Sequence, residues 1–174
     1  HALASSFGPL QSHPAYATLP EFPEITVLES TADKPSKIEC WHSDMTFRLH
    51  PPMGTVLRSK IIPDKGGDTC FASMTAAYDG LSPQMQTFLS GLDAVHDFSY
   101  GFKESLAEEG GRERLAQAVA DNPPVVHPVI RTHPESGKKV IFVNALFTTH
   151  IVGLPADESR AILQFLYQHC ITPE

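Results

Sequence analysis

Prolines divide this chain into short segments and limit the length of its helices and strands. The 174 residues include 15 prolines and 11 glycines. Proline has no backbone N–H and a fixed φ, so it is excluded from helix interiors and from the central strands of a sheet. Many short strands separated by Gly/Pro turns, with a few helices at the edges, are typical of a β-sandwich or jelly roll. The sequence therefore predicts a mostly β fold with helical insertions, an α+β arrangement.

Helices are predicted where apolar residues recur at spacings of three and four. Met85, Phe88 and Leu92 do so after Ser82, which is a suitable N-cap and is followed by a proline. Ser73 is a similar cap for a shorter helix. The predicted helices span residues 73–78 and 112–120, and two more begin at Pro83 and Pro155.

Strands are predicted where β-branched and aromatic residues cluster or alternate with polar ones. Pro134 and Gly137 mark the turn of a hairpin whose two arms are residues 125–131 and 138–143. The remaining predicted strands are residues 25–28, 41–47, 55–62, 69–71 and 93–98.

Charge and length argue against several classes of function. The net charge is −7, with 13 basic against 20 acidic residues and no basic stripe, so nucleic acid is not expected as a partner. No apolar run is long enough to span a bilayer, and we expect no membrane partner. Cys40, Cys70 and Cys170 are odd in number and widely spread, which indicates a reducing compartment and a cytoplasmic protein. We expect residues 1–174 to belong to a single domain.

His42 and Asp44 are the strongest candidates for chemistry in this sequence. In a β-strand, residues i and i+2 point to the same face, so both side chains could reach one point in space. Imidazole and carboxylate are two of the three ligands in the 2-His-1-carboxylate site that holds non-haem Fe(II). The alternative is a hydrogen-bonded His–Asp pair without a metal. Trp41, Met45 and Phe47 would pack on the opposite face of the strand.

Other polar residues have both a functional and a structural interpretation. Cys40 could be a further metal ligand, although a buried or half-buried thiol is favoured. His127 and His133 are each followed by proline and are interpreted as structural or exposed. Thr69 follows a Gly-Gly turn, where its hydroxyl could donate to a carboxylate or belong to an ordinary strand. His13 is interpreted, from spacing alone, as an exposed loop residue.

Several motifs occur in one order between residues 7 and 174. They are W-H-S-D-M-T-F at 41–47, P-P at 51–52, G-G-D-T at 66–69, H-D-F at 96–98, H-P-V-I-R-T-H-P at 127–134 and V-N-A-L-F-T-T at 143–149. Together these motifs resemble the TauD/TfdA family of Fe(II)- and 2-oxoglutarate-dependent dioxygenases, and most closely its taurine-oxidising members.

The resemblance implies a double-stranded β-helix, or jelly-roll, core in which His42 and Asp44 are catalytic residues that bind Fe(II). It implies that the Thr69 hydroxyl binds a carboxylate of the co-substrate 2-oxoglutarate. It also places four residues around the primary substrate, with the first as the donor to a sulfonate group: His13, Tyr16, Phe102 and Phe147.

By the same resemblance, the protein hydroxylates a small organic acid with O₂ and releases succinate and CO₂. A sulfonate such as taurine would also release sulfite. An alkyl sulfate or a carboxylic acid is an alternative substrate, because Ile38 stands where taurine-oxidising members carry an asparagine. A non-catalytic member that binds a ligand is the second alternative. A homodimer or homotetramer is compatible with the family.

Two parts of the family's site have no counterpart in this sequence. The family completes its iron site with a second histidine and binds the far carboxylate of 2-oxoglutarate with a later arginine. His150 and His169 lack the sequence pattern that surrounds the family's second histidine. The C-terminal strands of the jelly-roll core are also missing. We therefore expect this chain to be a portion of a longer protein, cut at both ends, because it begins at His1 and stops directly after a predicted helix.

Overall fold

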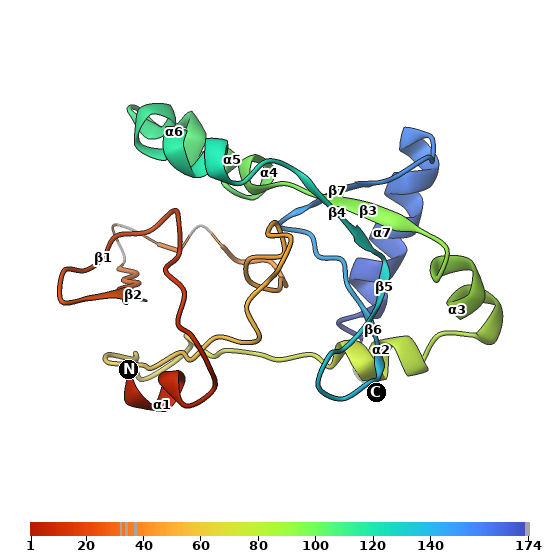
Figure 1. Ribbon diagram of the computed structural model, residues 1–174, viewed down its shortest axis with the longest axis horizontal. Helices are drawn as coiled ribbons and strands as arrows, with labels where there is room; N and C mark the ends of the chain where they lie inside the picture. The colour runs from red at the N-terminus through yellow and green to blue at the C-terminus, as the bar shows by residue number, and fades with distance from the viewer. Residues whose placement is uncertain (32, 34, 37, 173–174) are drawn as a thin grey trace.

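The computed structural model describes residues 1–31, 33, 35–36 and 38–172. Its central element is a three-stranded antiparallel sheet in the order β4-β3-β7 (Figure 1). The middle strand β3 (Asp93–His96) pairs with β4 (Val125–Pro128) on one side and β7 (Thr148–Ile151) on the other. Ala94 faces His127 in one ladder and Ile151 in the other. This sheet joins three segments that lie far apart in the sequence.

The larger hydrophobic core lies between this sheet and helix α7 (Ala156–His169), which runs behind the sheet in Figure 1. Leu163 and Leu166 point from α7 into the core, where Leu166 is fully buried. These two residues are three positions apart, a helical spacing that turns both side chains toward the sheet. The other buried members are Leu81, Leu89, Ala94, Val129, Ile130, Ile141, Val143 and Ile151.

The predicted hairpin of residues 125–131 and 138–143 is divided between two sheets. Its first arm splits at Val129, so that β4 joins β3, whereas β5 (Ile130–Thr132) pairs with β6 (Lys139–Ile141). Val129 lies at the change of sheet, where its N–H donates to the Leu92 carbonyl at 2.9 Å. Pro128 lies at the end of β4, an edge strand in the described sheet, where a missing N–H is tolerated.

The predicted helices are confirmed, because their signals are local. Ser73 caps α2 (Met74–Asp79) and Ser82 caps α3 (Pro83–Leu89), each by accepting a backbone N–H. The predicted helix 112–120 is α6 (Gly111–Asp121), and the last predicted helix is α7. Three shorter helices complete the set in the described residues: α1 (Ala2–Ser5), α4 (Phe98–Gly101) and α5 (Lys103–Ala107).

Several predicted strands are wrong. Residues 41–47 form an irregular segment followed by a turn, and residues 55–62 and 69–71 have no strand assignment. These last two segments are exposed, with Ile61 at 94% and Phe71 at 89%. A strand needs a partner for its ladder, and no described segment pairs with them. The predicted strand 25–28 overlaps β2 (Phe22–Thr26), which pairs with β1 (Thr18–Leu19).

Helices and antiparallel sheets are both present, as expected for an α+β chain, but helices hold more of the described residues than strands do. The expected predominance of strands is therefore not seen in this part of the protein. Among the described helices, none combines the length and apolar character that crossing a membrane requires.

A second hydrophobic cluster lies at the other end of the sheet, beneath the W-H-S-D-M-T-F segment. Phe47 and Phe98 are fully buried at its centre, and Phe147 is 2% exposed. Met45, Phe102, Leu115 and Ala118 complete the buried members. This cluster joins the segment that carries His42 and Asp44 to helices α4 and α6 and to the loop before β7.

Candidate metal and substrate site

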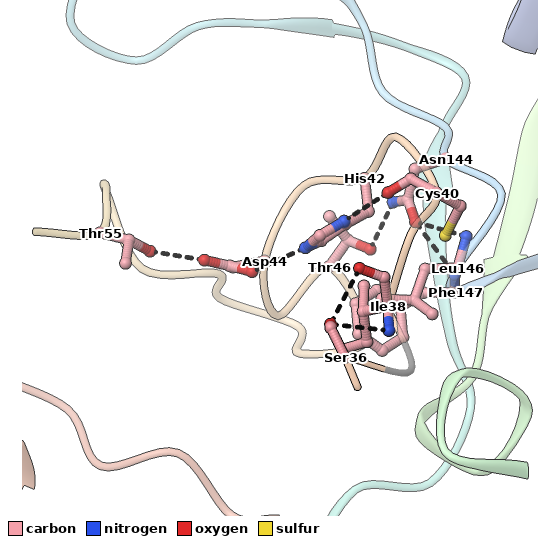
Figure 2. Close-up of polar contacts among 10 residues, drawn as sticks. All are labelled: Ser36, Ile38, Cys40, His42, Asp44, Thr46, Thr55, Asn144, Leu146 and Phe147. Carbon is pink, nitrogen blue, oxygen red and sulfur yellow. Dashed lines mark hydrogen bonds and ion pairs between the residues drawn. The ribbon is translucent and has the colours of Figure 1, made fainter. Parts of the chain in front are cut away.

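His42 and Asp44 come together, although not on the predicted strand. Asp44 begins a turn in which Met45 has a positive φ of 54°. The reversal buries Met45 and Phe47 as expected, but Trp41 stays 43% exposed, so its predicted packing is wrong. His42 Nε2 and Asp44 Oδ1 are 3.3 Å apart, with both side chains partly exposed (Figure 2).

Each member of this pair is held by one further hydrogen bond (Figure 2). The His42 Nδ1–H donates to the carbonyl of Cys40 at 2.8 Å, because a carbonyl can only accept. The Thr55 hydroxyl donates to Asp44 Oδ2 at 2.8 Å. These contacts leave His42 Nε2 and Asp44 Oδ1 facing one another. Outer hydrogen bonds of this kind commonly orient metal ligands.

The pair is charge-complementary in the metal-free chain. The hydrogen bond between His42 and Asp44 raises the pKa of His42 and lowers the pKa of Asp44. His42 therefore holds its proton more firmly beside Asp44 than a free histidine does. A divalent cation can take the place of that proton, because metal ligands bind in their deprotonated forms.

The donor set fits a partial metal site. Bonds of about 2.1 Å from one cation to a histidine nitrogen and a carboxylate oxygen are compatible with the 3.3 Å separation of these two atoms. No group of three or more His, Cys, Asp or Glu side chains with metal-binding geometry occurs within the described ranges. The described residues thus bring together two of the three ligand side chains that the resemblance implies.

The four expected substrate residues also come together. The His13 ring lies 4.6 Å from Tyr16 and 5.7 Å from Phe102, measured between centroids. Phe102 lies 6.2 Å from Phe147. The Arg48 guanidinium donates to Gln11 Oε1 at 2.8 Å and so ties the segment before His13 to the turn after Asp44. His13 is half-buried, so the interpretation of it as an exposed loop residue is wrong.

His13 has one defined tautomer. The Ala15 N–H donates to His13 Nδ1 at 3.1 Å, which places the ring proton on Nε2. Burial lowers the pKa of His13 to about 4, although the charge of Asp44 acts in the opposite direction. The imidazole is therefore neutral near pH 7 and offers an Nε2–H donor. Burial also raises the pKa of Tyr16, which keeps its phenol protonated.

Phe147 has a closely defined position. A Cβ on Gly101 would come within 2.4 Å of two carbons of the Phe147 ring, so only glycine leaves room for this side chain. On the other side, the Phe147 N–H donates to Asn144 Oδ1 at 3.0 Å. The ring is thus held between α4 and the loop that precedes β7.

Other candidate residues lie elsewhere. Thr69 is exposed and makes no hydrogen bond to His42 or Asp44 within the part of the chain that the structure describes. The Cys40 thiol is exposed, so the expectation of a buried thiol is wrong, and only its carbonyl contacts His42. The Cys70 thiol is exposed too.

The other histidines that were considered as metal ligands have structural contacts. His127 is buried and donates from Nε2 to the Arg48 carbonyl at 2.9 Å. His133 Nδ1 accepts the N–H groups of its own turn. His169 Nε2 lies 2.7 Å from the Ala77 carbonyl, and His150 Nδ1 lies 2.9 Å from the Thr149 hydroxyl. The structural interpretation of His127 and His133 is therefore supported.

Three polar residues near the site were not identified from the sequence as site residues. Thr55 contacts Asp44, and Thr46 and Asn144 are buried and hydrogen-bonded to one another at 3.0 Å. Thr55 was assigned only to a strand. Asn144 and Thr46 lie inside the motifs at 143–149 and 41–47. A polar residue among apolar neighbours is a sign of a buried hydrogen bond, and this sign could have identified both residues.

Comparisons with known proteins identify the family of this chain. A family model described as "Taurine catabolism dioxygenase TauD, TfdA family" matches residues 1–174. An alpha-ketoglutarate-dependent sulfonate dioxygenase of Saccharomyces cerevisiae is 39% identical over 127 residues, covering 73% of this chain and 29% of that protein. An alpha-ketoglutarate-dependent 2,4-dichlorophenoxyacetate dioxygenase of Cupriavidus pinatubonensis is 32% identical over 190 residues, covering 99% of this chain and 64% of that protein.

A solved structure is also similar. The crystal structure of a taurine dioxygenase from Burkholderia xenovorans matches with a TM-score of 0.62 and 34% identity, over 76% of this chain and 41% of that one. This chain spans 29% and 64% of the two curated relatives described above. Because the family model matches residues 1–174 throughout, this chain belongs to the TauD/TfdA family.

Proposed function

We propose that the protein containing this chain is an Fe(II)- and 2-oxoglutarate-dependent dioxygenase that hydroxylates a small organic acid, with a sulfonate as the favoured substrate. The observation that carries this proposal is the His42–Asp44 pair, whose donor atoms face one another 3.3 Å apart and whose Asp44 charge acts on the His13 ring. The yeast relative is named for sulfonates, which supports that substrate class.

Each residue of the site has a role in this proposal. His42 and Asp44 bind the metal, while the Cys40 carbonyl and the Thr55 hydroxyl orient them. The iron and 2-oxoglutarate, when bound, supply the activation of O₂ that oxidises a substrate C–H bond and yields succinate and CO₂. For a carbon that bears a sulfonate, the hydroxylated product releases sulfite.

In this proposal, the four expected substrate residues bind and orient the acid. The neutral His13 donates from Nε2 to its anionic oxygens, and the Tyr16 hydroxyl lies beside it. Phe102 and Phe147 form the apolar wall that excludes water from the reacting carbon. A hydrogen-bond donor beside an apolar wall suits an acid that carries a hydrocarbon part.

We also propose a fold for the whole domain and the residues that complete its metal and 2-oxoglutarate sites. The sheets of this chain belong to one jelly-roll domain, which the likeness to the Burkholderia structure supports. A second histidine and an arginine from sequence outside residues 1–174 complete the metal site and the 2-oxoglutarate site. The length of the curated relatives supports this arrangement. Thr69 binds a 2-oxoglutarate carboxylate, by its place in the family motif.

The test uses the full-length protein with Fe(II) and 2-oxoglutarate under anaerobic conditions. We expect a visible metal-to-ligand charge-transfer band that is lost in His42→Ala and in Asp44→Ala. His133→Ala is the matched control, since His133 contacts only its own turn, and it should keep the band. A full-length protein without the band contradicts the proposed function.

A carboxylic acid is the second candidate substrate, because the relative that covers 99% of this chain is named for 2,4-dichlorophenoxyacetate. Turnover of a panel of sulfonates, alkyl sulfates and aryloxyacetates separates these classes. We expect substrate-dependent succinate formation with sulfite release from a sulfonate. Succinate formed only with an aryloxyacetate would replace the sulfonate by a carboxylate. Binding without succinate formation would indicate a non-catalytic family member.

A further inference from the structure

Asn144 forms hydrogen bonds toward both halves of the site. Its Oδ1 accepts the backbone N–H groups of Leu146 at 3.1 Å and of Phe147 at 3.0 Å (Figure 2). The same oxygen therefore fixes the turn that carries the Phe147 ring. Asn144 is only 6% exposed, so water does not compete effectively for these contacts.

The amide nitrogen of Asn144 points toward the metal-binding segment. Its Nδ2–H donates to the hydroxyl of Thr46 at 3.0 Å, and Thr46 is 1% exposed. Thr46 comes two residues after Asp44 in the same turn. The amide cannot be reversed, because a flip would place an NH₂ group against two N–H donors. Its orientation is set by both neighbours at once.

His96 completes the contact on the far side of Thr46. His96 Nδ1 lies 3.0 Å from Thr46 Oγ1, and the His96 ring is fully buried in β3. Because the hydroxyl already accepts from Asn144, its single proton is available to His96 Nδ1. The turn after Asp44 is thus held by the sheet, and Asn144 connects that anchor with Phe147.

We propose that Asn144 is a positioning residue that couples the Phe147 wall of the substrate pocket to the metal-binding turn through Thr46. This proposal rests on the proposed function. In it, Asn144 touches neither substrate nor metal but sets the separation between the two. Small displacements of a reacting group are costly to the rate of an oriented reaction, so loss of this link should impair chemistry more than metal binding.

A purely structural role is the competing interpretation, and Thr148 offers a matched control for it. The Thr148 hydroxyl accepts the backbone N–H of Asn144 at 2.9 Å, and Thr148 is 2% exposed. It is a buried threonine that bonds to the same residue without contacting the metal-binding turn. Thr148→Val and Thr46→Val therefore remove similar groups, but only Thr46→Val breaks the link.

The experiment compares Thr46→Val, Thr46→Ser, Asn144→Ala and Thr148→Val in the full-length protein. The readouts are the charge-transfer band, its shift when the substrate is added, and the ratio of succinate formed to substrate hydroxylated. We expect Thr46→Val and Asn144→Ala to keep the band, lose the substrate-induced shift and lower kcat about tenfold, with more succinate per hydroxylation. Thr46→Ser, which keeps the hydroxyl, and Thr148→Val should behave as the wild type.

The outcomes separate this proposal from the proposed function. If Thr46→Val and Thr148→Val give the same coupling ratio, Asn144 is only structural and the positioning role is overturned. If Asn144→Ala does not fold, the two Thr46 variants still decide the question. A wild-type protein without the band overturns the proposed function and this proposal together.

A metal-free readout is a double-mutant cycle in urea, where non-additive effects of Thr46→Val and Asn144→Ala are expected.

Discussion

At the scale of single residues, Thr55 is the contact that most directly tests the metal site. Its hydroxyl donates to Asp44 Oδ2 at 2.8 Å and so directs the other carboxylate oxygen toward His42. We expect Thr55→Val to lower the affinity for Fe(II) by roughly 10- to 100-fold, which is typical for the loss of an outer hydrogen bond to a metal ligand. Anaerobic titration of the full-length protein measures this affinity.

Thr55→Ser is the control for that prediction, because it keeps the hydroxyl and removes only a methyl group. It should bind Fe(II) nearly as the wild type does. Equal affinities for the valine and serine variants would show that the hydroxyl does not orient Asp44.

His13 allows a second prediction at the same scale, on binding of the acid. Its Nδ1 accepts from Ala15, so recognition of the anion depends on the Nε2–H. We expect His13→Leu to raise KM for the substrate about tenfold or more, in line with the loss of a hydrogen bond to a charged group. His13→Gln, which retains an N–H donor, should recover part of this loss. Steady-state kinetics at saturating 2-oxoglutarate measures both, and a similar KM in the two variants would contradict the assigned role.

The sequence predicts that His42 and Asp44 meet, but it does not predict how they meet. His42 and Asp44 were identified from a spacing of two, and they do meet, although through a turn at Met45 rather than along a strand. The link between Thr46 and Asn144 joins residues 98 positions apart, and no local pattern encodes it. Contacts of this range depend on how the sheet brings the segments together.

At the scale of secondary-structure elements, the close approach of α4 to Phe147 is a testable feature. A Cβ on Gly101 would lie 2.4 Å from the Phe147 ring and 3.2 Å from the Leu146 carbonyl. We expect Gly101→Ala to displace the ring and to lower stability by about 1–3 kcal/mol, as overpacking does. Urea unfolding measures the loss of stability. The displaced Phe147 ring should also raise KM for the substrate.

Gly91→Ala is the matched control for this substitution. The nearest atom to a Cβ on Gly91 is the Phe88 carbonyl oxygen at 4.0 Å, and Gly91 does not have a positive φ. It should leave both stability and KM close to the wild-type values. Equal effects at the two glycines would show that the space beside Phe147 is not limiting.

The predicted helices all formed, whereas three predicted strands, residues 41–47, 55–62 and 69–71, did not, and the difference is physical. Ser73 and Ser82 cap their helices through N–H groups three residues away, so the whole signal is local. A strand depends on a partner elsewhere in the chain. Residues 55–62 have the composition of a strand but no ladder partner among the described residues, and they stay irregular.

At the scale of the whole molecule, two histidines with strongly lowered pKa values should make stability depend on pH. Burial lowers the pKa of His13 to about 4 and that of His96 to about 3. An unfolded histidine has a pKa near 6.5, so between pH 6.5 and pH 4 the unfolded chain binds more protons than the native one. The stabilising effect of keeping both rings neutral is complete above pH 6.5 and is lost as the pH falls. His42 contributes with the opposite sign, because its raised pKa favours the native state until the pH rises through that value.

We therefore expect the free energy of unfolding of the metal-free, full-length protein to decrease between pH 7 and pH 4.5. Urea unfolding at a series of pH values measures the decrease. His96→Gln removes one of the histidines with a lowered pKa and should make the pH dependence shallower, whatever its effect on stability at pH 7. His150→Gln is the matched control, since His150 is exposed, and its pH dependence should match that of the wild type. The same slope in the His96 and His150 variants would mean that His96 is not kept neutral by burial.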